Sequence, residues 1–396
     1  MGVRIGRRAT AAALVLVLGV VSVADDTYRQ PVLPSGESPG ALLSLTWNTY
    51  KADFITGEGR VRDRPPVGWD ETTSEGQAYA LLRAVWIDDR PTFDQVWAWT
   101  RDHLRPRGDS LLSWLWGPDH HGGFGVLSAS SATDADEDAA LALVLAGRRW
   151  NNDGYLVDAR QMLLDIWNKE VVRSEGTYYV AAGDWAGNSG QQVVVNPSYL
   201  APYAYRVFAE IDRARPWRAV AASSYLVLGQ CSGARLNATR SVGLPPNWCR
   251  IDTRDGAAGP YAGNDADRFG FDAFRVLWRV ALDYEWYRSA DALAYLRQTG
   301  FLRAQWKAHR RLAAQYTHDG VPVFGEGEEP FVYAAELGYF LVVDEAAGQT
   351  ILQDEVQSTL YRRGTVAYCG SRYNYYGQNW TWFGVALSRH ALAGVR

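Results

Sequence analysis

The sequence predicts an all-α protein, an (α/α)6 barrel of about twelve helices with a cleft built by loops at one end. Apolar residues recur with helical periodicity from about residue 41 onward. The connections alternate between short loops and longer loops rich in Gly, Asp, Trp and Tyr, and strand–turn–strand patterns of comparable length do not appear. Twelve helices taken as six hairpins give an inner ring inside an outer ring, which gathers the long loops at one end.

The expected helices follow one another along the chain with few irregular stretches between them. They are expected near 41–54, 75–88, 92–104, 135–150, 154–171, 197–212, 216–229, 271–287, 289–309, 330–345, 348–361 and 377–393. Small hairpins are expected in the loops near 171–183 and 313–325.

The N-terminus has the pattern of a targeting segment. Three arginines, an apolar run over 9–21 and a small-x-small site at 22–24 predict a signal peptide over 1–24, with an uncleaved anchor as the alternative. We therefore expect a secreted, extracellular or periplasmic protein, attached to a membrane only if the segment is retained. Residues 25–40 are rich in Pro, Gly and Ser and predict an extended linker, and 41–396 predict a single domain.

The composition narrows the classes of partner. A net charge of −4 gives no reason to expect nucleic acid or an anionic membrane surface as a partner. The chain has 17 Trp and 22 Tyr, and sugar rings have apolar faces that stack on such side chains, so the composition favours a carbohydrate groove. Six scattered His form no metal-binding pattern, so we expect no metal and no cofactor, and we expect a monomer.

Three cysteines leave two readings open. Cys231 and Cys249 flank a stretch rich in Gly, Asn and Pro and would close that loop as a disulfide, which export permits. Cys369 is then left over. Three separate buried thiols are the alternative reading.

Two expected helix starts carry acidic residues in unusual positions. Ser74 and Gln77 form a capping box, which places Glu75 in the first helical turn, where a carboxylate also suits the helix dipole. Residues 134–138 contain four acids in five residues, directly before an almost wholly apolar helix. Capping needs one or two of them, so the others, Asp134 among the candidates, are expected to be partnered or to line a polar cleft.

Two further helix starts have the same design. Asp272 and Arg275 are three residues apart at the start of an apolar helix, hence on one face, and a local ion pair is the simplest reading. Asn196 and Pro197 form a cap and a first helical position, so that Tyr199 projects from the first turn.

These side chains converge if alternate helices form the inner ring, because the helices of that ring then start at the same end of the barrel. The cleft would contain Glu75, Asp134, Tyr199, Asp272 and Arg275. Hydrolysis of a glycosidic bond needs one protonated carboxylic acid and one ionised carboxylate. A helix start lowers the pKa of a carboxyl group, so burial and neighbouring carboxylates must outweigh it if Glu75 is the acid.

At these residues the chain resembles glycoside hydrolase family 8, over nearly everything after the signal. The resemblance rests on 73–79 (TSEGQAY), 132–136 (ATDAD) running on to Trp150, 196–202 (NPSYLAP), 246–249 (PNWC), 271–275 (FDAFR) and 375–377 (YYG). Two positions depart from the family pattern: Ala139 stands where Ile or Met is usual, and Phe271 stands where Tyr is usual.

The resemblance implies an (α/α)6 barrel and an inverting mechanism in which Glu75 donates a proton and Asp272 activates water. It implies that Asp134 grips and distorts the sugar, and that Tyr199 and Arg275 hold the water. Trp114 and Trp185 fall where the family places stacking aromatics, and Tyr375 and Tyr376 belong to its C-terminal tyrosine segment. Inversion also predicts about 6.5–9.5 Å between the Glu75 and Asp272 carboxyl groups.

The expected activity is therefore endo-acting cleavage of a cellulose-like β-1,4-glucan. The alternatives are a β-1,4-xylanase or an exopolysaccharide-trimming hydrolase on the same fold, and more remotely a non-catalytic sugar-binding protein. Asp at position 272 fits the glucanase and xylanase subgroup better than the chitosanase type. The acidic run 134–138 also resembles the protonating motif of terpene cyclases, but export and the segment around Glu75 argue against that class.

Overall fold

The computed structural model describes residues 39–63, 68–119, 122–187, 191–323 and 327–394. The predicted signal segment and residues 25–38 of the predicted linker lie outside these ranges. The described residues contain thirteen α-helices: α1 (Pro39–Phe54), α2 (Ser74–Trp86), α3 (Arg90–Leu104), α4 (Thr133–Arg149), α5 (Asp153–Lys169), α6 (Pro202–Ile211), α7 (Trp217–Gly233), α8 (Phe274–Tyr287), α9 (Ala290–Gln298), α10 (Phe301–His309), α11 (Pro330–Val343), α12 (Glu345–Ile351) and α13 (Tyr375–Ser388).

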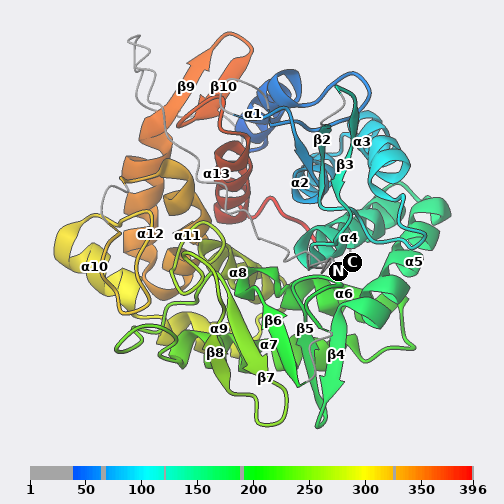
Figure 1. Cartoon of the computed structure of the whole chain (residues 1–396). Helices are drawn as coiled ribbons and strands as arrows, with labels where there is room; N and C mark the ends of the chain where they lie inside the picture. The colour runs from blue at the N-terminus through cyan, green and yellow to red at the C-terminus, as the bar shows by residue number, and fades with distance from the viewer. Residues whose placement is uncertain (1–38, 64–67, 120–121, 188–190, 324–326, 395–396) are drawn as a thin grey trace, which may run out of the picture.

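Six of these helices form an inner ring, in the order α2, α4, α6, α8, α11 and α13 (Figure 1). The ring closes where Tyr79 of α2 packs edge-on against Trp380 and Phe383 of α13. Helices α1, α3, α5, α7, α9 and α12 each pack against a member of the ring from outside. The predicted (α/α)6 architecture is confirmed.

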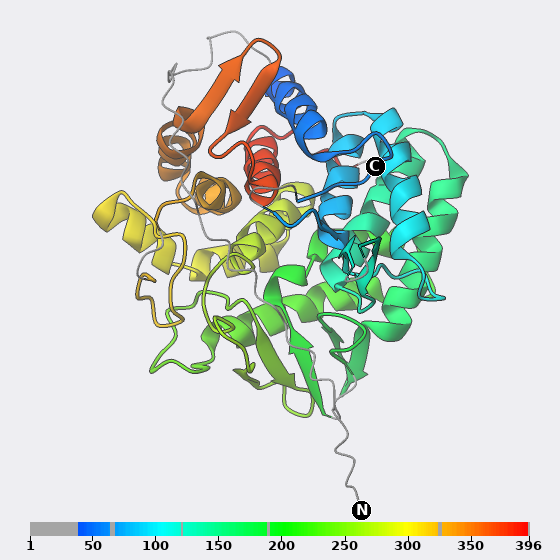
Figure 2. The same ribbon diagram turned by 45° about the horizontal axis from the view of Figure 1, so that its top comes forward.

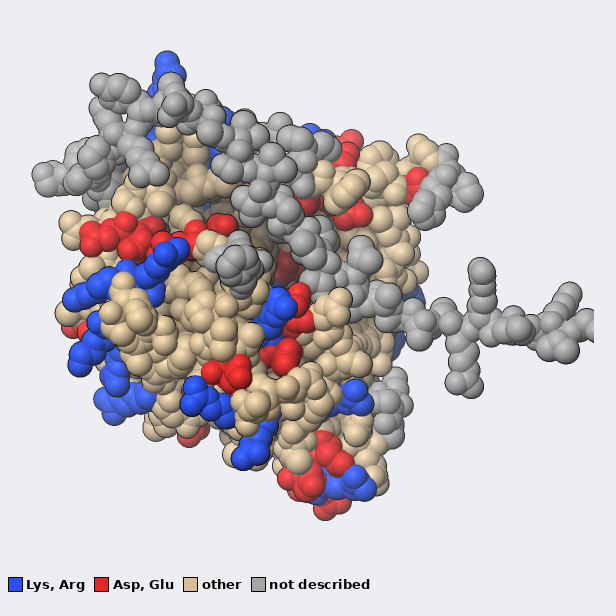
Figure 3. Space-filling model, turned by 60° about the vertical axis from the view of Figure 1, so that its left-hand side comes forward, with Lys and Arg blue, Asp and Glu red and all other residues tan. Residues whose placement is uncertain are grey.

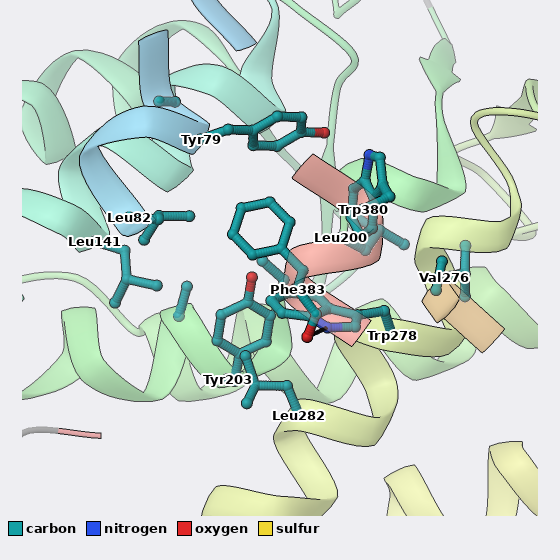
Figure 4. Close-up of a cluster of buried hydrophobic side chains, with 14 of the residues drawn as sticks. Tyr79, Leu82, Leu141, Leu200, Tyr203, Val276, Trp278, Leu282, Trp380 and Phe383 are labelled. Atoms are coloured by element: carbon teal, nitrogen blue, oxygen red, sulfur yellow. Dashed lines mark hydrogen bonds between the residues drawn. The ribbon is translucent and has the colours of Figure 1, made fainter. Parts of the chain in front are cut away.

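The core lies inside the ring, because the inner helices are apolar on nearly every side. Every residue of α2 except Glu75 is buried, and α4 is buried from Thr133 to Gly147. Figure 4 shows side chains from α2, α4, α6, α8 and α13 meeting there, with Trp278 donating from its indole nitrogen to the carbonyl of Phe383 at 3.0 Å. Burial of an aromatic side chain of this size contributes on the order of 3 kcal/mol.

Helices α11 and α13 approach each other closely because glycines face the contact. A side chain at Gly384 would collide with the backbone of Ala334 in α11, and one at Gly338 would collide with Leu387 in α13. Replacement of either glycine therefore requires the two helices to move apart.

Two predicted helices are each divided in two by a local break. The segment predicted at 197–212 is a 3-10 helix, Pro197–Tyr199, followed by α6, because Pro202 disfavours helical geometry at Ala201. The segment predicted at 289–309 ends at Gln298 and restarts as α10 after Gly300. The helix predicted at 348–361 begins earlier, at Glu345, and passes through a π-helix, Leu352–Val356, into a strand.

Short strands occupy the long loops. Two three-stranded sheets are formed by β1 (Thr72–Thr73), β2 (Leu115–Pro118) and β3 (Phe124–Ser128), and by β6 (Gln192–Val195), β7 (Cys249–Asp252) and β8 (Ala258–Pro260). The hairpin predicted near 171–183 is confirmed as β4 (Val171–Ser174) and β5 (Thr177–Val180). In the second predicted hairpin, near 313–325, the described residues up to 323 form isolated bridges from Tyr316 and no strand pair.

A second hairpin, β9 (Leu360–Arg363) and β10 (Val366–Cys369), was not predicted. Figure 2 shows it beside α1, where the backbone nitrogen of Ala367 donates to the hydroxyl of Thr49 at 2.9 Å. The strands β1 to β10 have two to five residues each. A strand this short shows too few alternating residues to be distinguished from the loop around it.

Cys231 at the end of α7 forms a disulfide with Cys249 at the start of β7, and Cys369 is a buried free thiol. The first of the two sequence readings is therefore confirmed. Because Cys249 follows Trp248, the disulfide fastens the loop that carries this tryptophan to the outer helix α7.

Charged side chains of both signs are spread over the surface of the protein. Figure 3 shows acidic and basic side chains intermixed over the face in view, in keeping with the net charge of −4. Among the residues that the structure describes, no helix has both the length and the apolar character needed to cross a bilayer.

Replacement of both Cys231 and Cys249 by Ser is expected to lower the free energy of unfolding by about 2–4 kcal/mol, because the disulfide no longer restricts the unfolded chain. Urea unfolding with and without reductant measures this. Reductant should destabilise the wild type and leave the double variant unchanged. Equal stability of the two oxidised proteins would show that the bond contributes nothing.

Candidate active site

The starts of the inner helices meet at one end of the ring, as the sequence predicted. Glu75 lies in the first turn of α2 and Asp134 in the first turn of α4. Tyr199 ends the 3-10 helix before α6, and Asp272 lies two residues before α8. Tyr375 opens α13. Residues far apart in sequence therefore share one end of the barrel.

Arg275 joins three of these carboxylates. Its Nη1 donates to Glu75 Oε1 and to Asp134 Oδ2, the latter at 3.0 Å, and its Nη2 donates to Asp272 Oδ1 at 2.5 Å. The ring of Tyr199 covers the guanidinium, with its centroid 5.4 Å from Cζ. The Arg275 side chain is only 2% exposed, so water screens these contacts little. The predicted local pair of Asp272 and Arg275 is one part of this larger cluster.

The start of α2 differs from the predicted capping box. Thr73, and not Ser74, is the cap: its Oγ1 accepts from the backbone nitrogen of Gly76 at 3.0 Å. The side chain of Gln77 does not accept a hydrogen bond from the backbone of the cap residue, as a capping box requires. Its Oε1 accepts from the backbone nitrogen of Val61, and its Nε2 donates to Thr100 at 2.7 Å. Gln77 is used for tertiary contacts because it is wholly buried.

Asp272 is held from two sides. It precedes α8, which begins at Phe274 and not at the predicted residue 271. Asn247 Oδ1 accepts from the backbone nitrogens of Asp272 and Ala273 at 3.3 and 3.0 Å. Trp248 Nε1 donates to Asp272 Oδ2 at 3.1 Å. Each carboxylate oxygen of Asp272 therefore accepts one hydrogen bond from a fixed donor.

The other acids of α4 are buried and partnered, as predicted. Asp138 forms two 2.8 Å hydrogen bonds with Arg279, and Glu137 accepts from Tyr205 at 2.8 Å. Asp136 accepts from the backbone nitrogen of Leu112 at 2.7 Å. These three contacts fasten α4 to its surroundings and leave Asp134 as the acid that faces the other site residues.

Burial is the main cause of the pKa shifts in the cluster. It raises the pKa of Glu75 above the ordinary value, against the effects of Arg275 and Tyr79, and the charge of Asp272 adds to the rise. Burial also raises the pKa of Asp134 to about 7, with Arg275 opposing and Glu75 adding. Burial is thus the main cause that raises the pKa of Glu75, and neighbouring carboxylates add to it, as the sequence required for an acid at a helix start.

The two predicted stacking tryptophans contact different neighbours at this end of the ring. The carbonyl of Trp114 accepts from the backbone nitrogen of Ser74 at 3.0 Å, which places Trp114 beside the start of α2. Trp185 is 40% exposed, and its ring centroid lies 6.3 Å from that of Trp248. Trp248 also meets the ring of Tyr199, at 5.8 Å.

The two predicted tyrosines make different contacts. The Tyr375 hydroxyl lies 3.4 Å from Thr73 Oγ1, next to Glu75. The Tyr376 hydroxyl donates to the carbonyl of Phe271 at 2.5 Å, and its ring packs against Phe274. Tyr376 therefore supports the segment that carries Asp272.

Three residues of the site were not assigned a role from the sequence. Tyr79 donates to Glu75 Oε1 at 2.6 Å, and the spacing of four residues along one helix face was the available signal. Trp248 and Asn247 lie in a segment whose resemblance to the family was noted without a role. Their contacts with Asp272 arise only in the folded chain.

The arrangement is suited to proton transfer. It places a carboxylic acid with a raised pKa near a second carboxylate, both within one cluster of fixed donors and half-buried aromatic rings. Within the described ranges, no group of three or more His, Cys, Asp or Glu side chains is arranged to hold a metal ion.

Comparison with known proteins gives a match over most of the chain. Residues 35–390 match the family model described as glycosyl hydrolases family 8. Endoglucanase C of Ruminiclostridium cellulolyticum is 36% identical over 261 residues, which are 63% of this chain and 52% of the relative. The chain thus spans about half the length of this relative.

The fold is similar to those of solved structures. The endo-β-1,4-glucanase CMCax from Acetobacter xylinum aligns with a TM-score of 0.67 at 24% identity, over 90% of this chain and 99% of that one. A β-1,3-1,4-glucanase from Paenibacillus sp. X4 aligns with a TM-score of 0.72 at 19% identity, over 91% and 94%.

Replacement of Arg275 by Met is expected to lower the free energy of unfolding by about 3–5 kcal/mol at pH 8, because three carboxylates lose their shared cation. At pH 5 the loss is expected to be smaller, since carboxyls without the cation have higher pKa values and take up protons. Urea unfolding of variant and wild type at both pH values measures the difference. Arg254→Met, which removes an exposed partner of Asp252, is the control and should change little at either pH. An equal loss at both pH values would contradict the role of the shared cation.

Proposed function

The chain belongs to family 8 of the glycosyl hydrolases, and on this basis we propose that it is an inverting, endo-acting hydrolase of β-1,4-linked glucan. The observation that carries the proposal is the cluster around Arg275, in which Glu75 and Asp272 take different terminal nitrogens of one guanidinium. Inverting glycosidases use two such carboxyl groups on either side of the scissile bond.

Glu75 is proposed as the general acid. Its side chain is 20% exposed, and burial raises its pKa, so that it keeps a proton under conditions where an ordinary glutamate has lost it. It donates this proton to the leaving oxygen of the glycosidic bond. Tyr79, bonded to the same carboxyl group, fixes its orientation.

Asp272 is proposed as the general base. Its side chain is 32% exposed, more than that of Glu75, and is therefore within reach of solvent. It removes a proton from a water molecule that attacks the anomeric carbon from the face opposite the leaving group. Arg275 and Tyr199 lie beside the carboxylate and help to position that water.

Asp134 is proposed to bind the sugar at the cleavage point. Its Oδ2 accepts from Arg275, while its Oδ1 is buried and has no hydrogen-bond partner among the described residues. A buried polar atom without a partner is costly, so a sugar hydroxyl that reaches Oδ1 gains a strong contact. Trp114 and Trp185, with Tyr375, supply aromatic surface for the neighbouring sugar rings.

The glucan preference rests on the relatives. The curated relative reported above is named an endoglucanase, and the two solved structures are described as glucanases. A β-1,4-xylanase or an exopolysaccharide-trimming hydrolase on the same fold is the second candidate, since the residues around Arg275 serve any β-1,4-linked chain. Export is proposed as well, and the disulfide of Cys231 and Cys249 supports it, because such bonds persist in oxidising compartments.

Glu75→Gln and Asp272→Asn are each expected to lower kcat by about 10²–10⁴-fold, because each removes one of the two proton-transfer groups. Release of reducing ends from carboxymethyl cellulose measures this, and circular dichroism checks that both variants fold. Asp102→Asn, which alters an exposed carboxylate of α3, is the matched control and should keep wild-type turnover. Near-normal turnover in either site variant would falsify its assignment.

The pH dependence follows from the raised pKa of Glu75. Activity is lost as the pH rises through this pKa, so the alkaline limb of the kcat/KM profile should lie above pH 4.5, the ordinary pKa of a glutamate side chain. A profile whose alkaline limb lies at or below that pH would show that Glu75 is not the acid.

The substrate class is tested by comparing kcat/KM on carboxymethyl cellulose, mixed-linkage β-glucan, xylan and chitosan. We expect the highest value on one of the two glucans, and the first-formed product should have the α-configuration by NMR because the mechanism inverts. A higher value on xylan would favour the second candidate. Release of sugar from none of the four would contradict hydrolysis of these chains.

A further inference from the structure

Two buried carboxyl groups beside the start of α4 take no part in the proton transfers described above. Asp136 lies in the first turn of α4, Glu170 lies directly after α5, and both are 0% exposed. Asp136 Oδ1 accepts from the backbone nitrogen of Leu112 at 2.7 Å, and Glu170 Oε1 accepts from the Ser131 hydroxyl at 2.5 Å. The second oxygen of each group has no donor among the described residues.

The carboxyl groups of Asp136 and Glu170 face each other, because their side chains form a hydrogen bond. An ionised carboxylate can only accept, so a hydrogen bond between two carboxyl groups requires a proton on one of them. Two buried carboxylates without this proton would repel each other and would leave two oxygens unpaired. The two oxygens that lack a donor are therefore those that share the proton.

The charged groups around the pair do not replace this proton. Arg107 is the cation on the side of Asp136, but its guanidinium already donates to two other carboxylates, at 3.0 and 2.5 Å. Glu137, the next residue of α4, and Asp184, in the loop after β5, are acids beside Glu170. A negative charge on the pair therefore gains no free counter-ion from these neighbours.

Burial and the neighbouring charges act on the pair in the same direction. Burial raises the pKa of Asp136 well above its ordinary value, and the charge of Glu170 adds to the rise. Burial likewise raises the pKa of Glu170, against its hydrogen bond from Ser131 and with an added rise from the charge of Asp184. The pair therefore keeps a proton at a pH where an exposed aspartate or glutamate has lost it.

The start of α4 depends on this pair because no side chain caps the helix. The residue before the helix is Ala132, which has no side-chain oxygen to accept from the first-turn nitrogens. Ser131 donates to Glu170 instead, and the backbone nitrogen of Asp184 donates to the Ser131 hydroxyl at 2.9 Å. Thr133 donates to the carbonyl of the residue after β5 at 2.7 Å. The first turn of α4 is therefore held from α5 and from the loop after β5.

Asp134 lies inside this arrangement, one residue after Thr133 and two residues before Asp136. Its Oδ2 is fixed by Arg275. The direction of its Oδ1, which has no partner among the described residues, follows from the position of the first turn of α4. Misplacement of a positioning group by about 1 Å can cost about 100-fold in rate.

We propose that Asp136 and Glu170 share a proton, and that this bridge positions Asp134 for the sugar at the cleavage point. Neither residue of the bridge touches the substrate, since both are wholly buried. The positioning role rests on the proposed glucanase function, while the shared proton does not. The bridge makes folding take up one proton, because the same two carboxyl groups are ionised in the unfolded chain above about pH 5.

Asp136→Asn tests the proton, because an amide has the shape of a protonated carboxyl group. Its oxygen still accepts from Leu112, and its nitrogen donates to Glu170 without a titratable proton. Folding of the wild type then takes up one more proton than folding of this variant, so the wild type loses stability as the pH rises. Between about pH 5 and 7 its unfolding equilibrium constant should rise by about tenfold per pH unit relative to that of Asp136→Asn. Urea unfolding at several pH values measures the ratio.

Asp102→Asn is the matched control, because it makes the same replacement at an exposed carboxylate of α3. The ratio of the wild-type unfolding constant to that of the control should not change over this pH range. A pH-independent ratio for Asp136→Asn as well would show that the pair holds no proton and would overturn the bridge.

Turnover of carboxymethyl cellulose tests the positioning role. Asp136→Asn keeps the bridge and should retain about half or more of the wild-type kcat, whereas Asp136→Ala removes it and should lower kcat by about 10–100-fold with little change in KM. Ser131→Ala, a milder change that removes one donor to Glu170, should lower kcat by a smaller factor. An equal kcat in Asp136→Asn and Asp136→Ala would overturn the role. If Asp136→Ala does not fold, Ser131→Ala decides, and a wild-type kcat in that variant overturns the role.

Failure of the proposed function gives a different result. A wild type that releases sugar from none of carboxymethyl cellulose, mixed-linkage β-glucan, xylan and chitosan contradicts hydrolysis and, with it, the positioning role. Urea unfolding of the wild type and Asp136→Asn still decides in that case whether the pair holds a proton.

Discussion

Three acidic side chains from three separate parts of the ring depend on one guanidinium, that of Arg275. Glu75 comes from α2, Asp134 from α4 and Asp272 from the segment before α8, and each is bonded to Arg275. Without a cation between them, negative charges on three carboxylates that lie this close together and are largely shielded from water would repel one another strongly. The relative positions of the helix starts therefore follow from where Arg275 lies, and α8 is the helix that sets it.

The same geometry is repeated one turn deeper in the barrel. Arg279 follows Arg275 by four residues, and Asp138 follows Asp134 by four, so α8 and α4 face each other through two successive Arg–Asp pairs. Buried ion pairs add little net stability, but a displaced pair leaves an uncompensated charge. The two successive pairs thus specify how α4 lies against α8. The pair of Arg279 and Asp138 supports the pair of Arg275 and Asp134, and Arg275 also contacts both proposed catalytic carboxylates.

Much of this arrangement could be predicted from the sequence, because it rests on periodicity and on local spacing. Twelve helical segments indicated the double ring, and the acids at the helix starts indicated the site. What could not be predicted depends on contacts between distant segments. Asn247 supports the start of α8 from a loop 25 residues away, and Thr73 replaces Ser74 as the cap because Gln77 is drawn into tertiary contacts. The breaks after Tyr199 and Gln298 were missed because helical periodicity continues across them.

The close contact of α11 and α13 has a consequence for the opposite end of α13. At Gly384 no side chain separates the two helices, so a slide of α13 by one turn would press a larger residue against Ala334. Tyr376 lies eight residues earlier on the same helix, about 12 Å along its axis. Tyr376 donates a hydrogen bond to the segment that carries Asp272. The position of that segment along the barrel axis therefore depends on the helix contact at Gly384. A substitution at Gly384, deep in the core, can therefore displace the segment that carries Asp272.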